Sequence, residues 1–219
     1  MILCIQNLLP PPDVATVRRV LAGATFVDGK STAGWHAAMV KHNLQASPAG
    51  ESTGEADETV RRALANNDLF RSAARPKALS PFLFSSYRDG MRYGAHVDDA
   101  LMGDLRSDLS FTIFLSDPTD YDGGELVMDQ HQGEQAFKLD AGDMVLYPST
   151  TLHRVEPVTR GTRLAAVGWV QSRIRRSDQR EMLFDLETAR LSLYGREGKS
   201  AEFDLLSKSV SNLLRMWAE

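Results

Sequence analysis

The sequence predicts a mainly β domain that is flanked by helices and followed by a C-terminal helical hairpin. Between residues 79 and 171, seven or eight short apolar segments are separated by turns rich in Gly, Asp and Pro, which is typical of a β-sandwich or barrel. Apolar stripes at helical spacing precede this region and also follow it. We therefore expect one domain over residues 1–175, made of a helical N-terminal layer (1–75) and a β core (76–175), and a helical appendage over 176–219.

The N-terminal layer is expected to hold two helices after a short first strand. In residues 11–24, apolar side chains recur at helical spacing and Gly23 lies near the end. Residues 55–73 repeat this pattern and predict a second helix. Between the helices, the sequence predicts short extended pieces over 26–34, an extended segment or loop over 35–43, and a polar loop over 46–54.

The β core begins where the apolar period changes from helical to alternating. In chain order, the expected strands cover residues 82–87, 92–97, 109–115, 122–128, 137–139, 143–147 and 164–171. Two strands of one small sandwich or barrel can bring distant parts of a chain side by side. Polar residues at the strand ends are therefore candidates for a shared site.

The appendage carries two apolar stripes, over residues 177–194 and 201–217. A hairpin of this length is too small to build an independent core. One stripe can close the hairpin or cover the β core, whereas the other would stay exposed in a monomer, and such a patch usually marks an interface. The sequence thus predicts a homodimer formed partly by these helices; the alternative is that both stripes pack on the chain's own β core.

Composition limits the class of protein and its partners. The chain has 219 residues, 42% hydrophobic and 25% charged, with a formal net charge of −4, which argues against a general nucleic-acid-binding surface. The single cysteine, Cys4, excludes an intrachain disulfide framework and fits a reducing compartment. The N-terminus lacks the basic region of a secretory signal, and no apolar run approaches the ~18 residues of a membrane span. We expect a cytoplasmic protein without a membrane partner.

The most informative motif joins His96 and Asp98 with His153, 55 residues after Asp98. On a strand, residues two apart point to the same face, so His96 and Asp98 can act together. Two imidazoles and one carboxylate form the facial triad that holds Fe(II) and leaves coordination positions open. We assign these three residues as metal ligands and as the catalytic centre.

A purely structural interpretation must be weighed against this one. A buried histidine is most often a satisfied core residue, and His-X-Asp occurs frequently by chance. The flanks of His153, however, have the apolar pattern of strands at 143–147 and 163–170. Those strands can bring His153 beside the His-X-Asp pair, which favours the metal site.

Arg163 follows His153 by ten residues and stands at the head of an apolar strand. Its guanidinium offers a planar, permanently charged fork that suits a carboxylate. At this spacing we assign it to the far carboxylate of 2-oxoglutarate. The alternative is a surface arginine at a strand end, as Arg154 or Arg160 would be.

The same stretches resemble the bacterial PKHD-type hydroxylases, which are iron-uptake-associated proteins with a prolyl-4-hydroxylase-like catalytic domain. The resemblance covers nearly the whole chain. Its motifs are Tyr87-Arg88-Asp89-Gly90, His96-Val97-Asp98, Tyr121-Asp122-Gly123-Gly124-Glu125-Leu126, Ala141-Gly142-Asp143, Leu146-Tyr147-Pro148-Ser149, His153-Arg154-Val155, Arg160-Gly161-Thr162-Arg163 and Gln171-Ser172.

This resemblance implies a double-stranded β-helix (jelly-roll) core, an Fe(II) cofactor, 2-oxoglutarate as co-substrate and a dependence on L-ascorbate. A tyrosine at the position of Tyr87 binds the co-substrate in the wider prolyl-hydroxylase group; the alternative is a core tyrosine. Ser110 and Thr112 lie on one face of their strand, and we place them in the same co-substrate pocket. The glycines of Gly123-Gly124 are expected to form a structural turn.

The leading hypothesis is an Fe(II)- and 2-oxoglutarate-dependent dioxygenase that hydroxylates a small-molecule or protein substrate and releases succinate and CO2. A second hypothesis is a nucleic-acid demethylase on the same core, which the acidic balance disfavours. A third is a non-catalytic sensor of iron or 2-oxoglutarate, against which the intact triad and Arg163 argue. Succinate release separates enzyme from sensor, and competition by RNA or DNA separates the two enzymes.

Overall fold

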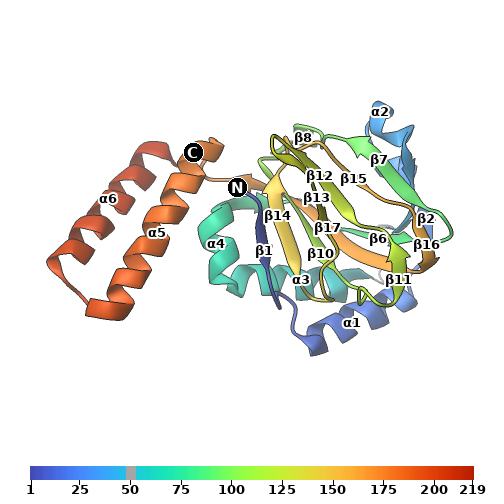
Figure 1. The fold of residues 1–219 in the computed structure, drawn as a ribbon, viewed down its shortest axis with the longest axis horizontal. Coiled ribbons are helices and arrows are strands. Elements are labelled where there is room, and N and C mark those ends of the chain that lie inside the picture. The colour runs from blue at the N-terminus through green and yellow to red at the C-terminus, as the bar shows by residue number, and fades with distance from the viewer. Residues whose placement is uncertain (48–52) are drawn as a thin grey trace.

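Two β-sheets face each other and form the centre of the molecule in the computed structural model, which describes residues 1–47 and 53–219. In Figure 1, helices α1, α3 and α4 lie along one side of these sheets, and α5 and α6 extend away from them as a separate pair. This arrangement is the jelly-roll core with flanking helices and a C-terminal hairpin that the sequence predicts.

Eight strands form the larger sheet, and their pairing is antiparallel. In spatial order they are β1 (Leu3–Ile5), β14 (Met144–Pro148), β10 (Leu109–Phe114), β17 (Arg163–Ser172), β6 (Leu83–Tyr87), β4 (Leu44–Ala46) and β2 (Phe26–Asp28), with β5 (Pro76–Leu79) also paired to β17. The first strand expected at the N-terminus is thus confirmed as β1, at the edge of this sheet.

The smaller sheet carries His96 at the end of a strand, and Asp98 follows two residues after that strand ends. In spatial order it contains β13 (Gly133–Phe137), β12 (Leu126–Gln130), β15 (His153–Val155), β7 (Arg92–His96) and β3 (Lys41–His42). Two short ribbons complete the β structure of the described residues: β11 (Tyr121–Gly123) with β16 (Val158–Gly161), and β8 (Leu101–Met102) with β9 (Leu105–Arg106).

Alternating side chains of the larger sheet serve two different cores. On β10, Phe111 and Ile113 pack in a cluster with apolar residues of α1, α3 and α4. On β14, Leu146 joins that cluster, whereas Val145 and Tyr147 join a second cluster that includes residues of β12 and β15. Because both faces of β14 are buried, this strand is almost continuously apolar. On β10 the polar Ser110 and Thr112 are also buried, on the face opposite Phe111 and Ile113.

The helices begin and end close to the predicted positions. They are α1 (Pro11–Ala22), α2 (Trp35–Ala38), α3 (Gly54–Asn66), α4 (Asp68–Ala74), α5 (Ser177–Glu197) and α6 (Ala201–Trp217), with a 3₁₀ turn, η1, at Gly29–Thr32. The prediction of a single helix over residues 55–73 is wrong in one respect, because the structure has two helices there, separated at Asn67. The side-chain Oδ1 of Asn67 accepts a hydrogen bond from the backbone N–H of Phe70 (2.8 Å) and caps a new helix, α4.

Two other segments differ from expectation. Residues 35–43, expected as an extended segment or loop, contain one turn of helix, α2, followed by β3. The strand predicted at 137–139 is instead β13, which ends at Phe137 and pairs with β12 in a tight hairpin. Most of β13 is exposed, so its sequence carries no apolar signal. Most of the loop predicted over 46–54 lies outside the described residues.

The C-terminal hairpin has a small core of its own. Leu183 of α5 and Val210 of α6 are buried together with Ile174, which follows β17. Ile174 also forms an isolated β-bridge with Ala218, so the end of the chain returns to the β core. Several large apolar side chains of the hairpin remain exposed: Met182, Leu191, Tyr194, Leu205 and Met216.

The described helices include none with the length and apolar character that crossing a membrane requires.

Candidate active site

His96, Asp98 and His153 come together where the smaller sheet meets the cavity. His96 is the last residue of β7 and His153 is the first residue of β15, and the two are direct partners in the antiparallel register. One ligand atom from each of the three residues lies within 4.8 Å of the others. The Nε2 atoms of His96 and His153 are 4.0 and 3.9 Å from the same oxygen, Oδ1 of Asp98.

The backbone fixes both imidazoles in the same way. Nδ1 of His96 lies 2.8 Å from the carbonyl oxygen of Gly94, and Nδ1 of His153 lies 2.9 Å from that of Thr151. Because a carbonyl can only accept, each Nδ1 carries the proton and each Nε2 keeps a free lone pair. This tautomer presents two Nε2 atoms to a metal ion.

Burial keeps the His96 imidazole neutral. Removal from water, followed by the neighbouring His153, lowers the pKa of His96 to about 4. The ring of Tyr93 stacks on His96 with centroids 3.6 Å apart and an angle of 16° between the planes. Tyr93 thus restricts the ring rotation of His96. Two neutral imidazoles and one carboxylate form the donor set that Fe(II) accepts in a facial triad.

Ser110 holds the remaining oxygen of Asp98. Its Oγ donates to Oδ2 of Asp98 at 2.5 Å and also lies 2.8 Å from Oγ of Ser149. Since the carboxylate can only accept, this hydrogen bond turns Oδ1 toward the two imidazoles. Ser110 was predicted to line the co-substrate pocket. The structure instead places it behind Asp98, outside the residues that line the cavity.

Arg163 is buried without a counter-ion. Its side chain is 1% exposed, and its Nε and Nη2 have no hydrogen-bond partner among the described residues. The guanidinium carbon lies 5.3 Å from the ring centroids of both Tyr87 and Phe114. Tyr87 is also the register partner of Arg163 across β6 and β17. A buried, unpaired guanidinium fits a carboxylate-bearing ligand, because an isolated buried charge is otherwise costly.

Gly124 gives Arg163 its space. Gly123 and Gly124 both have positive φ values, +72° and +70°, as the expected turn requires. A Cβ atom on Gly124 would lie 3.0 Å from Cδ of Arg163 and 2.8 Å from a methyl group of Val158. The turn is therefore structural, as predicted, and it also shapes the wall around the guanidinium.

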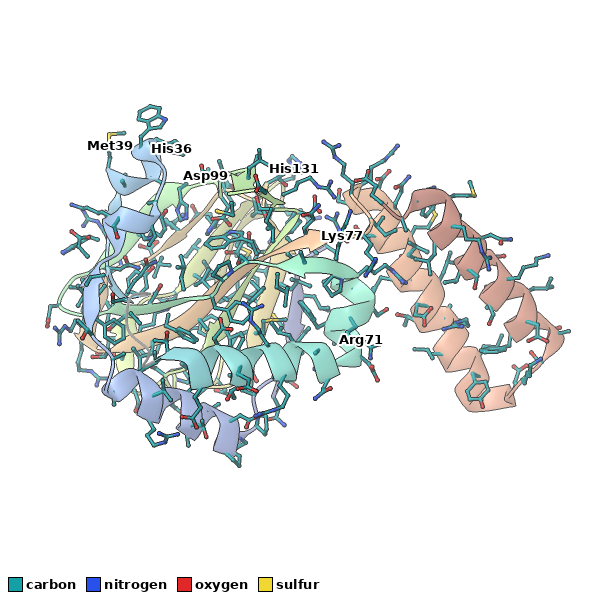
Figure 2. All side chains as sticks on the ribbon, turned by 180° about the vertical axis from the view of Figure 1, so that it is seen from behind. His36, Met39, Arg71, Lys77, Asp99 and His131 are labelled. Atoms are coloured by element: carbon teal, nitrogen blue, oxygen red, sulfur yellow. The ribbon has the colours of Figure 1, made fainter. Side chains whose placement is uncertain are left out.

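The cavity that contains the triad is lined by strands of both sheets and by residues near α2. Thr112, one of the predicted pocket residues, belongs to its lining, whereas Tyr87 and Arg163 lie behind it. Figure 2 shows His36 on the projecting α2, Met39 directly after this helix, and Asp99 at the same end of the β core. Asp99 itself lines the cavity, so the cavity opens at this end of the molecule.

Among the lining residues, Lys41 and Tyr93 received no functional role from the sequence, and Tyr147 was named only within a family motif. The hydroxyl of Tyr147 lies 3.4 Å from Nε2 of His153. Burial and, second, the carboxylate of Asp98 raise the pKa of Tyr147 well above its ordinary value, while Arg163 opposes that effect. Tyr147 therefore stays protonated between the triad and Arg163. In the sequence it is signalled by its place on an apolar strand near His153 and by the motif Leu146-Tyr147-Pro148-Ser149.

The fold and the triad define a 2-oxoglutarate- and Fe(II)-dependent oxygenase, and residues 82–171 match the family model of the 2OG-Fe(II) oxygenase superfamily. Residues 178–219 match a second model, the PKHD-type hydroxylase C-terminal domain. The chain is 53% identical to a PKHD-type hydroxylase of Gloeothece citriformis over the full length of both proteins. It is 54% identical to one of Picosynechococcus, with 98% of each chain covered. The chain thus belongs to the PKHD-type hydroxylase family.

Solved structures agree on the fold. A prolyl-4-hydroxylase of Pseudomonas putida superposes with a TM-score of 0.54 at 24% identity, covering 78% of this chain and 92% of that one. A prolyl hydroxylase of Trichoplax adhaerens, solved with a hypoxia inducible factor peptide, gives a TM-score of 0.59 at 16% identity, with 83% and 86% covered. Together with the family models and the curated relatives, this confirms the sequence-based assignment to an Fe(II)/2-oxoglutarate hydroxylase.

Proposed function

We propose that His96, Asp98 and His153 each supply one ligand to Fe(II), and that Arg163 binds the C5 carboxylate of 2-oxoglutarate. The observation that carries this proposal is the pairing of a compact triad with a fully buried guanidinium that has no acidic partner among the described residues. A ligand with one carboxylate at the metal and another at the far end satisfies both sites. When bound, Fe(II) and 2-oxoglutarate supply the oxidative decarboxylation that hydroxylates a C–H bond and releases succinate and CO2.

The remaining predicted site residues take supporting roles in this proposal. Thr112 lines the cavity and offers a hydroxyl to the co-substrate. Tyr87 stands beside Arg163 and limits the directions in which the guanidinium can point. Ser110 acts through Asp98, because its hydroxyl orients the carboxylate instead of contacting the co-substrate. The buried Tyr147 hydroxyl lies beside His153 at the metal end of the site.

The proposal also covers the domain organisation of the chain, its oligomeric state and its location. We place the dioxygenase domain at residues 1–175 and the helical appendage at 176–219, and we propose that exposed apolar residues of the appendage form a homodimer interface. We also propose a cytoplasmic location, where the single exposed Cys4 stays reduced. Dependence on L-ascorbate belongs to this proposal, as a reductant that returns the iron to Fe(II).

A turnover assay tests the proposed function. Protein loaded with Fe(II) is given 2-oxoglutarate under oxygen, and succinate is measured with and without ascorbate. The wild type is expected to release succinate, whereas His96→Ala is expected to release none. His131→Ala, which changes an exposed histidine in the turn between β12 and β13, serves as the matched control. Binding of 2-oxoglutarate by the wild type without any succinate would point to a sensor.

A further inference from the structure

Lys41 is a buried cation at the active-site cavity. It lies on β3, at the edge of the smaller sheet, and is the register partner of Tyr93 on β7. Its side chain lines the cavity that contains the metal triad, and the residue is only 4% exposed. Among the described lining residues it is the one lysine or arginine. The part of the chain that carries Lys41 therefore brings a positive charge to a site otherwise lined by neutral and acidic groups.

The ammonium group of Lys41 is poorly satisfied by the protein. Nζ donates to Oγ1 of Thr32 at 3.0 Å and lies 5.0 Å from the ring centroid of Tyr93. It makes no salt bridge with any described residue. An ammonium carries three N–H donors, so donor capacity is left over inside the cavity. Burial lowers the pKa of Lys41 to about 8, while the more distant Asp98 and Asp28 oppose that effect. The group is still mainly charged at neutral pH.

A second unpaired donor lines the same cavity. Nε1 of Trp169 is buried and has no hydrogen-bond partner among the described residues. The acceptor of Gln45 is already used, because Oγ1 of Thr32 donates to its Oε1 at 2.5 Å. Much of the remaining wall is apolar, including Leu83 and Val167. The cavity thus offers free donors between apolar walls, which is the complement of an acceptor on an apolar body.

The co-substrate leaves this charge unused. In the proposed function, one carboxylate of 2-oxoglutarate goes to the metal and the other goes to Arg163. Arg163 projects from β17 of the larger sheet, whereas Lys41 projects from β3 of the smaller one. Lys41 is thus a third position that can bind a negative charge, beside the metal and Arg163. The anionic group that it binds must come from a ligand other than 2-oxoglutarate.

We propose that Lys41 binds a carboxylate of the prime substrate, which makes the substrate a carboxylic acid such as a free amino acid or a peptide with a free C-terminus. This inference rests on the proposed function, because it assigns the metal and Arg163 to 2-oxoglutarate. Trp169 supplies a second hydrogen bond to the same substrate. Lys41 is then a specificity-determining residue that fixes which end of the substrate enters the cavity.

The test uses matched pairs of probes. Protein loaded with Fe(II) and 2-oxoglutarate is given the twenty L-amino acids and short peptides, each as the free acid and as the C-terminal amide. Succinate release above the rate without probe is measured. At least one acid is expected to raise the rate, and its amide is expected to be inactive, because the amide carries no charge to pair with Lys41. An amide that matches its acid, or a panel in which no acid stimulates, overturns the proposal.

Variants at Lys41 then assign the effect to this residue. Lys41→Met is expected to raise the half-saturating concentration of the stimulating acid by at least about tenfold, and Lys41→Arg is expected to recover part of the loss. Lys77→Met is the matched control, since Lys77 is exposed on β5 and lies toward the C-terminal helices in Figure 2. If Lys41→Met instead raises the requirement for 2-oxoglutarate, the lysine serves the co-substrate and the proposal is wrong.

A binding measurement without turnover completes the design. The stimulating acid is expected to raise the melting temperature of the wild type under anaerobic conditions, but not that of Lys41→Met. Without any probe, Lys41→Met is expected to melt above the wild type, because it removes a buried and poorly paired charge. A melting temperature below that of the wild type would mark Lys41 as a structural residue. If the wild type never forms succinate under any condition, the proposed function itself is wrong. If it forms succinate but no acid stimulates the rate, only the role proposed for Lys41 is wrong.

Discussion

His96 and His153 are direct partners across β7 and β15, and their Nε2 atoms lie at nearly equal distances, 4.0 and 3.9 Å, from Oδ1 of Asp98. Each Nδ1 is held by the backbone carbonyl of the residue two positions earlier in the chain. The same local device therefore sets the tautomer of both rings, and the sheet register brings them together. The three ligand atoms thus converge on one point, as a facial metal site requires.

Ser110→Ala tests the support of Asp98. The change removes the hydroxyl that donates to Oδ2 of Asp98 at 2.5 Å, so the carboxylate gains rotational freedom. Loss of such an indirect partner typically weakens metal binding by about 10–100-fold. Anaerobic titration with Fe(II) should show a loss in this range, with Ser110→Thr retaining most of the affinity. Unchanged iron affinity in Ser110→Ala would show that the carboxylate of Asp98 keeps its orientation without this hydrogen bond.

Arg163→Ala tests the co-substrate anchor. Removing one partner of a buried, hydrogen-bonded charge pair costs on the order of 2–5 kcal/mol, so the half-saturating concentration of 2-oxoglutarate should rise by at least about thirtyfold. Iron binding should change little, because Arg163 is not a ligand. Arg160→Ala is the matched control: Arg160 is exposed on β16 and pairs with Asp122. Steady-state kinetics and Fe(II) titration separate the two effects, and an unchanged requirement for 2-oxoglutarate moves the anchor elsewhere.

The sequence predicted the triad because its three ligands carry their own local context. His96 and Asp98 are two apart at the end of a predicted strand, although β7 itself ends at His96, and His153 lies between two recognisable strands. The fold class could be predicted for a related reason, since turns separate the strands and helical stripes flank them. Neither inference depended on knowing how the sheets pack.

The residues that sequence reasoning missed depend on tertiary placement. Lys41 lies in a segment with no clear period, and only the pairing of β3 with β7 brings it to the cavity. Tyr147 looks like a core residue of an apolar strand, and the facing sheet determines that its hydroxyl meets His153. Ser110 and Thr112 share a strand face as predicted, but one lies behind Asp98 and the other lines the cavity. The alternation of residues along a strand predicts which face a side chain occupies, but it does not predict which group that side chain contacts.

The pH dependence of stability tests the burial of Lys41. Its pKa falls from 10.5, the ordinary value, to about 8 in the folded protein, where Asp98 and Asp28 are the acidic groups that oppose the fall. Between pH 8 and 10.5 the unfolded chain binds more protons than the folded one, so wild-type stability rises with pH in this window. Below pH 8 the full cost of the buried charge remains, on the order of 3 kcal/mol.

Lys41→Met lacks this titration. In metal-free protein, the stability advantage of Lys41→Met over the wild type should be largest near neutral pH and should shrink as the pH rises from 8 to 10.5. Other groups that titrate in this range cancel in the difference between the two proteins. Urea unfolding at several pH values measures it, with Lys77→Met as the control. A difference that stays constant over this window would mean that burial does not perturb Lys41.

The C-terminal hairpin gives the last prediction. Leu191 of α5 is 57% exposed and Leu205 of α6 is 58% exposed, although their helices already share a core built on Leu183 and Val210. In Figure 1 the hairpin extends away from the sheets, so the β core does not cover both of its faces. If a second copy covers these residues, light scattering at micromolar concentration should give twice the monomer mass of 24.2 kDa. Leu191→Glu combined with Leu205→Glu should return the monomer, because paired carboxylates are costly to bury. Lys208→Glu, a charge change on α6, is the control. If the wild type is a monomer, the proposed dimer is wrong. If a dimer persists after the double substitution, the interface lies elsewhere, on the β core or on another part of the hairpin.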